Sequence, residues 1–366
     1  MVRQRVTMAD VALRAGVSTT AVSLVLNDRQ GTRLSEDAAK RVRAAADELG
    51  YRPNLTARAL STRKSRIIGF ISEQVTVDRL ASGLIRGALR EAKRQNHVLF
   101  IAETEGEPDA LDEAVDALTD RQVDGIIYAA TRPHALRLPA RVGGTPVVML
   151  NAVADEAEGP AGGSRPDAVL ADERTGAIDV VDLLLDAGHS EGVVIVGRSV
   201  DQPDDEWLSL AVQRRLDGIW ESLGAHGVRP IAQLPCRPWS VKAGYEAVRD
   251  LLAAGVTPHA LICLNDRLSF GAYRALGEAG LQVGRDVSVV SFDDDDIAVY
   301  LHPMLTTAAA PFEEMGALAV RLLLDADHEP GEHLVPMPTR VRDSVHLTRA
   351  RAAELQQQSP EPDWTR

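Results

Sequence analysis

Two groups of polar residues in this 366-residue chain have the types and spacing of binding sites. The first lies between Thr7 and Asn27, where small hydroxyl and amide side chains alternate with apolar residues. Such side chains can bond base edges in the major groove of DNA or contact its phosphates. The second group consists of carboxylates, an arginine, an amide and a tryptophan spread over the larger C-terminal part. These groups suit the hydroxyls and the apolar face of a sugar.

The first group is placed by a predicted helix-turn-helix. Thr7 and Ser18 are expected to cap two short helices, with Gly16 permitting the turn between them. The second helix of such a motif enters the major groove by its N-terminal end, so Thr19 and Thr20 are predicted to read bases. The predicted phosphate contacts are Thr7, Ser18, Ser23, Asn27 and Arg33. An ordinary helical hairpin whose Ser and Thr only cap helices is the alternative.

Charge and the following elements favour the DNA-binding interpretation. A third helix is predicted over Ser35–Leu49, ended by Gly50, and a short weakly apolar linker follows from Asn54. Residues 1–64 carry a net charge of +6, whereas the rest of the chain carries −19. A basic head on an acidic body is typical of a protein in which only the head touches DNA.

The remainder of the chain alternates short apolar runs with amphipathic helical stretches, interrupted by the Gly/Pro/Ser-rich segment 158–166. This alternation predicts parallel sheets with helices on both faces, arranged as two similar lobes with a cleft between them. The expected fold class is an all-α helix-turn-helix head plus a two-lobed α/β core. The expected parts are a DNA-binding head (1–53), a hinge (54–65), a ligand-binding and dimerisation domain (66–346) and a disordered tail (347–366). Within that domain we expect an N-lobe over 66–169 and 309–326, and a C-lobe over 170–305 and 332–346.

In sheets of this kind ligands lie at the carboxyl ends of the strands. The candidate ligand contacts follow predicted strands, start a helix or follow a Pro-rich turn: they are Asp172, Arg215, Trp239, Asn265 and Asp293. For each of them the alternative is structural, because an Asp after a strand often caps the next helix and a lone Trp is usually packed. The acidic run Asp293–Asp296 is interpreted as a solvated turn, and no metal site, cofactor or catalytic residue is predicted.

The segments TMADVALRAGVSTTAVSLVLN, ELGYRPNLTARAL and IIGFI resemble the LacI/GalR family of bacterial repressors. The resemblance extends from about Val6 to about residue 346. It places Thr19, Thr20 and Leu24 at the base-reading positions of the recognition helix. It places Tyr51 and Asn54 at backbone-contacting positions, and Ala57 and Leu60 at hinge positions that enter the minor groove. Many members carry Arg where this chain has Leu24, so the operator half-site is expected to differ.

The same resemblance extends to the core, which is similar to periplasmic sugar-binding proteins. It places Arg215, Trp239, Asn265 and Asp293 at effector-contacting positions, and Asp172 in a stretch whose spacing varies among relatives. Arg198 and Asp217 stand near the presumed cleft mouth, where relatives usually carry small residues. The resemblance implies a homodimeric repressor on a pseudo-palindromic double-stranded DNA operator, controlled allosterically by a small molecule, most simply a carbohydrate. Whether the ligand is an inducer or a corepressor stays open, as does a nucleobase or a phosphosugar.

Two other classes of protein are weighed against this interpretation. A sugar-transport component is disfavoured by the segment 6–60 and by the absence of an apolar signal segment near the N-terminus. An α/β enzyme is disfavoured because no GxSxG, HExxH or P-loop pattern is present. Two cysteines are too few for a disulfide framework, and no apolar run approaches membrane-spanning length. We therefore expect a cytoplasmic, non-enzymatic regulator with no membrane partner, bound to the nucleoid when on its operator.

Overall fold

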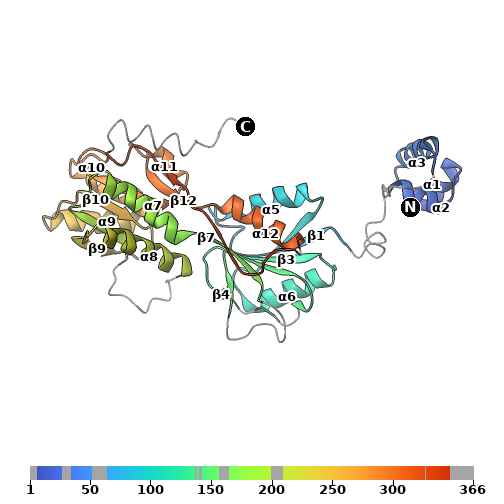
Figure 1. The fold of residues 1–366 in the computed structure, drawn as a ribbon, viewed down its shortest axis with the longest axis horizontal. Helices are drawn as coiled ribbons and strands as arrows, with labels where there is room; N and C mark the ends of the chain where they lie inside the picture. Colours follow the sequence, from blue (N-terminus) through green and yellow to red (C-terminus); the bar gives the residue numbers. More distant parts are fainter. Residues whose placement is uncertain are drawn as a thin grey trace. The chain divides into compact units, whose positions relative to one another are not determined.

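The computed structural model describes residues 6–26, 34–51, 64–136, 138–139, 142–155, 165–198, 209–325 and 327–346. The chain folds into two compact units, Met1–Arg66 and Ile67–Arg366. The first is a small helical head and the second is a large α/β body (Figure 1). Each unit buries a hydrophobic core of its own.

The head contains three helices, α1 (Met8–Ala15), α2 (Thr19–Leu26) and α3 (Glu36–Leu49). Its core is built around Val11, Val22 and Val42, one from each helix, all fully buried. The pattern that predicted three helices with one shared core is therefore confirmed. In the part of the chain that the structure describes, no single helix is long and apolar enough to span a membrane. The α1–α2 pair meets that criterion only jointly and is bent by 102°.

Local signals fix where the helices of the head begin and end. Thr7 and Asp10 form a reciprocal capping box at the start of α1, because each side chain accepts from the other residue's backbone N–H. Gly16 ends α1 with φ of +68°, a left-handed conformation that glycine adopts without strain. Ser35 caps α3, as predicted, and Gly50 ends it in the same left-handed conformation.

The N-lobe of the body is a six-stranded sheet in the order β13-β7-β5-β3-β1-β2, and all its strand pairs are parallel. In that order the strands are Glu332–Val335, Asp167–Ala171, Val147–Leu150, Gly125–Ala130, Ile67–Glu73 and Val98–Glu103. Helices α5 (Ser82–Arg94) and α12 (Phe312–Leu324) pack together on one face. Helix α6 (Pro108–Thr119) covers the other face (Figure 1). A two-stranded sheet joins β4 (Ala135–Leu136) to β6 (Val153–Ala154).

The C-lobe repeats this architecture with strand order β14-β12-β11-β10-β8-β9, in which the short edge strand β14 alone is antiparallel among the described strands. In that order the strands are Thr339–Arg340, Thr306–Ala309, Ser288–Asp293, Ala260–Cys263, Val193–Gly197 and Ala232–Pro235. Strands β8 and β10 are buried throughout, as central strands covered on both faces must be. The helices are α7 (Glu173–Asp186), α8 (Leu210–Ala225), α9 (Val241–Ala253), α10 (Asp266–Glu278) and α11 (Ile297–Tyr300). Helix α7 packs against α8, and α9 packs against α10.

The chain passes between the two sheets three times: after β7, between β12 and α12, and between β13 and β14. This path corrects one predicted boundary. The segment 332–346 was expected to lie wholly in the C-lobe, but Glu332–Val335 pairs with β7 and is the edge strand of the N-lobe sheet. Only the part from β14 onward joins the C-lobe. The tail from residue 347 lies outside the described residues, as do the hinge residues 54–63.

Candidate DNA-reading surface and effector site

The head presents a polar surface at the start of α2. Thr19 and Thr20 are exposed in the first turn of this helix, where the predicted base readers were expected. Ser18 is also exposed, and its Oγ accepts from the N–H of Ala21 at 3.1 Å, so it acts as a helix cap. Ser23 and Leu24, further along α2, are half-buried. The geometry therefore leaves the two threonines accessible to a ligand such as DNA.

The other predicted DNA contacts are distributed differently. The hydroxyl of Thr7 is used inside the capping box, donating to the carboxylate of Asp10 at 2.7 Å. Tyr51 is half-buried and packs against the core of the head. Five predicted contacts lie outside the described residues: Asn27, Arg33, Asn54, Ala57 and Leu60.

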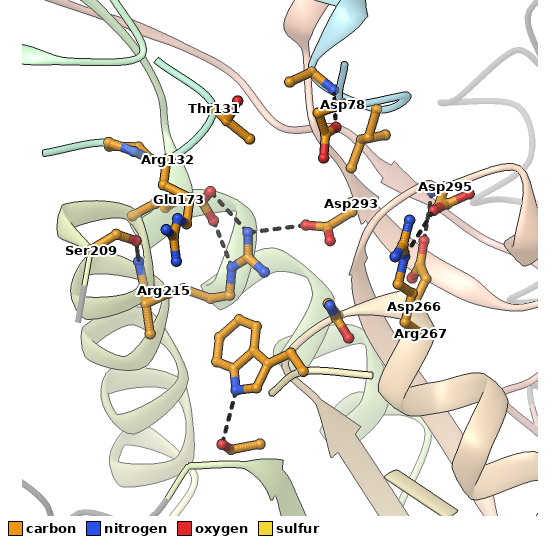
Figure 2. Close-up of a pocket in the computed structure, with 18 of the residues that line it drawn as sticks. Asp78, Thr131, Arg132, Glu173, Ser209, Arg215, Asp266, Arg267, Asp293 and Asp295 are labelled. Atoms are coloured by element: carbon orange, nitrogen blue, oxygen red, sulfur yellow. Dashed lines mark hydrogen bonds and ion pairs between the residues drawn. The ribbon is translucent and has the colours of Figure 1, made fainter. Parts of the chain in front are cut away.

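The body contains a cavity of about 520 Å³ between its two lobes. It opens at the carboxyl ends of the strands, since its wall includes Ala171 at the end of β7, Gly197 at the end of β8 and Asp293 at the end of β11. This is the position at which doubly wound sheets bind ligands. Residues of the N-lobe, such as Asp78 and Thr131, face residues of the C-lobe across it (Figure 2).

Arg215 of α8 lies in the wall of the cavity and is the centre of a network of hydrogen bonds. Its Nε and Nη2 donate to the carboxylate of Glu173 at 2.7 and 2.9 Å, and Nη1 donates to the carbonyl of Leu264 at 2.6 Å. Nη2 also reaches Asp293 Oδ1 at 3.3 Å (Figure 2). The guanidinium carbon lies 4.5 Å from the centre of the Phe292 ring. Burial lowers the pKa of Arg215, but the two carboxylates raise it by more. The arginine is a permanent buried cation shared by two acids.

Asp293 is the strained member of this network. Its backbone has φ of +104°, a conformation that residues with a side chain rarely adopt and that is concentrated at functional sites. Burial raises the pKa of its carboxyl group to about 6, although Arg215 acts in the opposite direction. A carboxyl group with this pKa can change protonation near neutral pH, and its ionised form accepts hydrogen bonds from hydroxyl groups.

Trp239 and Asn265 also line the cavity, as predicted from the sequence. The indole Nε1 of Trp239 donates to the carbonyl of Gly197 at 3.0 Å, which fixes the orientation of the ring. The side-chain oxygen of Asn265 accepts from the N–H of Leu268 at 2.9 Å, so this residue caps α10 as well as facing the cavity. A fixed aromatic plane beside polar groups is the arrangement that sugar sites use.

Asp172 occupies a different place from the predicted one. Its carboxylate accepts from the N–H of Thr175 and caps α7, which is the structural role that an Asp after a strand often has. Asp172 is not among the described residues that line the cavity. The next residue, Glu173, lines the cavity instead and pairs with Arg215. Arg198 also lines the cavity and is buried, whereas Asp217 is exposed and does not line it.

Further cavity residues were not proposed as ligand contacts from the sequence. Among them are Asn151, which directly follows β5, Asp266, which starts α10, and Asp78, which lies between β1 and α5. Asp266 is fully buried and accepts from the hydroxyl of Thr307 at 2.9 Å. Burial, followed by the charge of Asp293, raises the pKa of Asp266 well above its ordinary value.

The acidic run at the end of β11 is a set of ion pairs, which corrects its interpretation as a solvated turn. Asp294 pairs with Arg342 at 2.8 Å. Asp295 is buried and, together with Asp296, pairs with Arg79. Because Arg79 follows β1, this last contact joins the N-lobe to the C-lobe.

The architecture defines a class of protein: a helix-turn-helix head on a two-lobed binding domain with a polar cavity, that is, a ligand-responsive DNA-binding protein. Comparison with known proteins agrees. Residues 7–54 match the model of "Bacterial regulatory proteins, lacI family", and residues 181–345 match that of a "Periplasmic binding protein-like domain". The chain belongs to the LacI family of bacterial regulators and is a DNA-binding transcriptional regulator.

Individual relatives match over most of their length. The transcriptional repressor CytR of Escherichia coli is 31% identical over 330 residues, covering 90% of this chain and 91% of the relative. The ribose operon repressor of Escherichia coli is 29% identical over 345 residues, covering 93% and 97%. Among solved structures, the Lac repressor dimer bound to operator and an anti-inducer is 27% identical, with a TM-score of 0.73 and coverage of 94% and 100%.

Proposed function

We propose that this protein is a homodimeric repressor that binds a pseudo-palindromic operator and is switched by a neutral carbohydrate in the inter-lobe cavity. The observation that carries the proposal is the cavity itself, whose wall combines Trp239 with several hydrogen-bonding side chains drawn from both lobes. The relatives named above include a ribose operon repressor, and a LacI-family regulator from Enterococcus faecium that is 27% identical was solved with bound ribose.

The charge of the cavity wall favours a neutral polyol over a phosphorylated ligand. Five arginines among the described lining residues face five acidic residues, so the wall carries no large formal excess of positive charge for a phosphate group. A sugar hydroxyl both donates and accepts hydrogen bonds, and such a wall supplies partners for both. We assign Arg215 the role of holding Glu173 and Asp293 in place, and Trp239 that of packing on the apolar face of the ring.

For the DNA-binding role we propose Thr19 and Thr20 as base-reading residues. Both are exposed at the N-terminal end of the second helix, the end that enters the major groove in this motif. Leu24 stands on the same helix and is half-buried; it offers no polar contact, so it would discriminate by apolar contact alone. Ser18, Thr7, Ser23 and Tyr51 remain candidates for contacts to the backbone of DNA.

A homodimer is supported by the edge of the N-lobe sheet. Strand β2 pairs with β1 and is an edge strand of the sheet. Three of its apolar residues, Val98, Phe100 and Ile101, have exposed fractions of 58%, 40% and 42%. Leu89 on the adjacent helix α5 is exposed as well. Clustered apolar side chains on a sheet edge are typical of a surface that another chain covers. A second copy bound there would join two DNA-binding heads in one molecule, which is the number that two half-sites require.

Ligand and DNA binding would be coupled through the arrangement of the lobes. The cavity takes its wall from both lobes, so a bound sugar favours the lobe arrangement in which both sets of contacts form. If operator binding favours one arrangement, linkage requires that DNA and sugar change each other's affinity by the same factor. We propose no catalytic step, and we propose that the protein acts on DNA in the cytoplasm of a bacterial cell.

The test is a thermal-shift screen of pentoses, hexoses, their phosphates and nucleosides on the full-length protein, followed by calorimetry. A neutral sugar at about 100 times its Kd should raise stability by about 2.7 kcal/mol. The matched variant Trp239→Ala should lose most of the shift while keeping its own fold and its salt-dependent DNA binding. Stabilisation by sugar phosphates or nucleosides alone would overturn the neutral-sugar assignment, and turnover of any bound sugar would overturn the binding-only role.

A further inference from the structure

A second polar cluster lies away from the cavity, at the edge of the N-lobe sheet that β13 forms. Asp167 is the first residue of β7, and His333 lies on the paired edge strand β13. His328 lies between α12 and β13. Because Asp167 begins its strand, the cluster lies at the amino ends of parallel strands, whereas the cavity lies at their carboxyl ends. None of these three residues lines the effector cavity.

The three side chains converge on one point. His328 Nε2 lies 2.8 Å from Asp167 Oδ2, and His333 Nε2 lies 3.0 Å from Asp167 Oδ1. In the described part of the chain, this is the one group of three His, Cys, Asp or Glu residues whose ligand atoms all lie within 4.8 Å of one another. The side chains are 13%, 21% and 25% exposed for Asp167, His328 and His333, so they are mostly enclosed but still open to solvent.

The surroundings orient the cluster. His328 Nδ1 donates to the carbonyl of Asp325 at 2.7 Å, which fixes the ring and turns Nε2 toward Asp167. This backbone bond to the remote ring nitrogen is the support that metal-binding histidines typically have. The N–H of Gly331 donates to Asp167 Oδ1 at 2.8 Å, so the turn between α12 and β13 is organised around the carboxylate.

We propose that Asp167, His328 and His333 bind a divalent transition-metal ion of the Zn²⁺ class. Two imidazole nitrogens and one carboxylate oxygen are a donor set that suits such ions, with water completing a tetrahedron. Bonds of about 2.0–2.2 Å to a tetrahedral ion separate its ligand atoms by about 3.3 Å. The two histidine nitrogens contact different oxygens of Asp167, and the three ligand atoms all lie within 4.8 Å of one another. Bringing them to this separation around one ion therefore needs side-chain adjustments of at most about 1.5 Å. The ion would tie the edge strand β13 to β7, independently of the sugar site.

The alternative is a purely hydrogen-bonded triad, and the chain offers a matched control for it. His97 Nε2 lies 3.2 Å from Asp124 Oδ2, and both side chains are about as buried as the proposed ligands, but among the described residues no second imidazole completes that pair. If the cluster near His328 is only a hydrogen-bonded brace, its metal affinity should be no better than that of the His97 pair.

The experiment uses untagged full-length protein freed of metal by a chelator that is then removed. Calorimetry with Zn²⁺ and absorption spectroscopy with Co²⁺ as a probe should both show one ion per chain, and Zn²⁺ should raise the melting temperature. His328→Gln and His333→Gln should each weaken binding by at least about 100-fold, since loss of an outer partner alone costs about 10–100-fold. His97→Gln should bind as the unmodified protein does.

A further variant separates metal binding from loss of fold. Asp167→Asn keeps an oxygen that can accept from Gly331 but supplies a poor metal ligand, so it should retain the circular dichroism of the native fold and lose the Zn²⁺-induced stabilisation. Two results would overturn the proposal: binding no tighter than about 0.1 mM, or tight binding that the two histidine variants leave unchanged. Neither result bears on the sugar cavity.

Discussion

Replacing Arg215 by Met removes the cation at the centre of the cavity wall while keeping most of the side-chain volume. The arginine side chain is 6% exposed and the Glu173 carboxylate that it holds is 8% exposed. After the substitution Glu173 is a buried carboxylate without this partner, and Asp293 loses the same cation. Removing one member of a buried ion pair costs about 3–5 kcal/mol, mainly because the remaining charge is left without compensation.

We take the lower part of that range for Glu173 and add nothing for Asp293, whose side chain is 21% exposed and therefore partly solvated. The expected loss of unfolding free energy for Arg215→Met is therefore about 3–4 kcal/mol. For the unit Ile67–Arg366, an unfolding entropy of about 2.1 cal/mol/K per residue makes this a fall in melting temperature of about 5–6 °C. Urea unfolding followed by circular dichroism, at constant slope, measures the loss directly.

A double-mutant cycle and the pH dependence of stability test whether the loss of unfolding free energy comes from the broken ion pair. Glu173→Gln removes the acid, so Arg215→Met/Glu173→Gln should cost at least about 1 kcal/mol less than the sum of the single changes. In Arg215→Met alone, Asp293 loses the cation that lowers its pKa, so burial raises its folded-state pKa further above the unfolded value. The folded state then binds more protons than the unfolded state, so stability falls as pH rises, and the deficit should shrink between pH 7.5 and 5.5. A loss below about 1 kcal/mol, or strict additivity, would refute the view that this network is a buried ion pair.

Two further predictions follow from the site and from the head. Because burial raises the pKa of Asp293 to about 6, and we expect its ionised form to bind the sugar, affinity measured by calorimetry should fall about fourfold between pH 7.5 and 5.5. Asp293→Asn should bind more weakly and lose that pH dependence; a variant that keeps it would show that another group titrates. Thr20→Trp should abolish preference for the operator in anisotropy titrations but keep salt-dependent non-specific binding. Unchanged footprints on the operator would refute the role of Thr20.

The head could be predicted almost residue by residue because its signals are local. The capping box of Thr7 and Asp10, the left-handed Gly16 and the cap at Ser35 all act over four residues or fewer. A sequence pattern records such interactions directly. The alternation of strands and helices likewise predicted two parallel sheets, since each strand run and helix run is itself local.

The sites were predicted less completely because they depend on side-chain direction and on distant pairing. Asp172 and Glu173 are neighbours after the same strand, yet the first turns back to cap α7 and the second enters the cavity. Strand β13 pairs with β7, which lies far away in the sequence. The lobe to which β13 belongs could therefore not be predicted from its position in the sequence. Asp167 and His328 are 161 residues apart, and no spacing motif joins them.

The turn after β11 shows why cavity and lobe arrangement should respond together. Asp293 reaches Arg215 in the cavity wall, and two residues later Asp295 pairs with Arg79 of the N-lobe. Asp295 also donates its backbone N–H to the buried Asp266 at 2.7 Å, so the turn is anchored between these contacts. A ligand that draws Asp293 away from Arg215 must move or strain this turn, and with it the ion pair across the lobes. The turn after β11 can thus transmit a change in the hydrogen bonds of Asp293 at the ligand to the ion pair between the lobes. That ion pair ends in the N-lobe, whose first strand, β1, follows the DNA-binding head in the sequence.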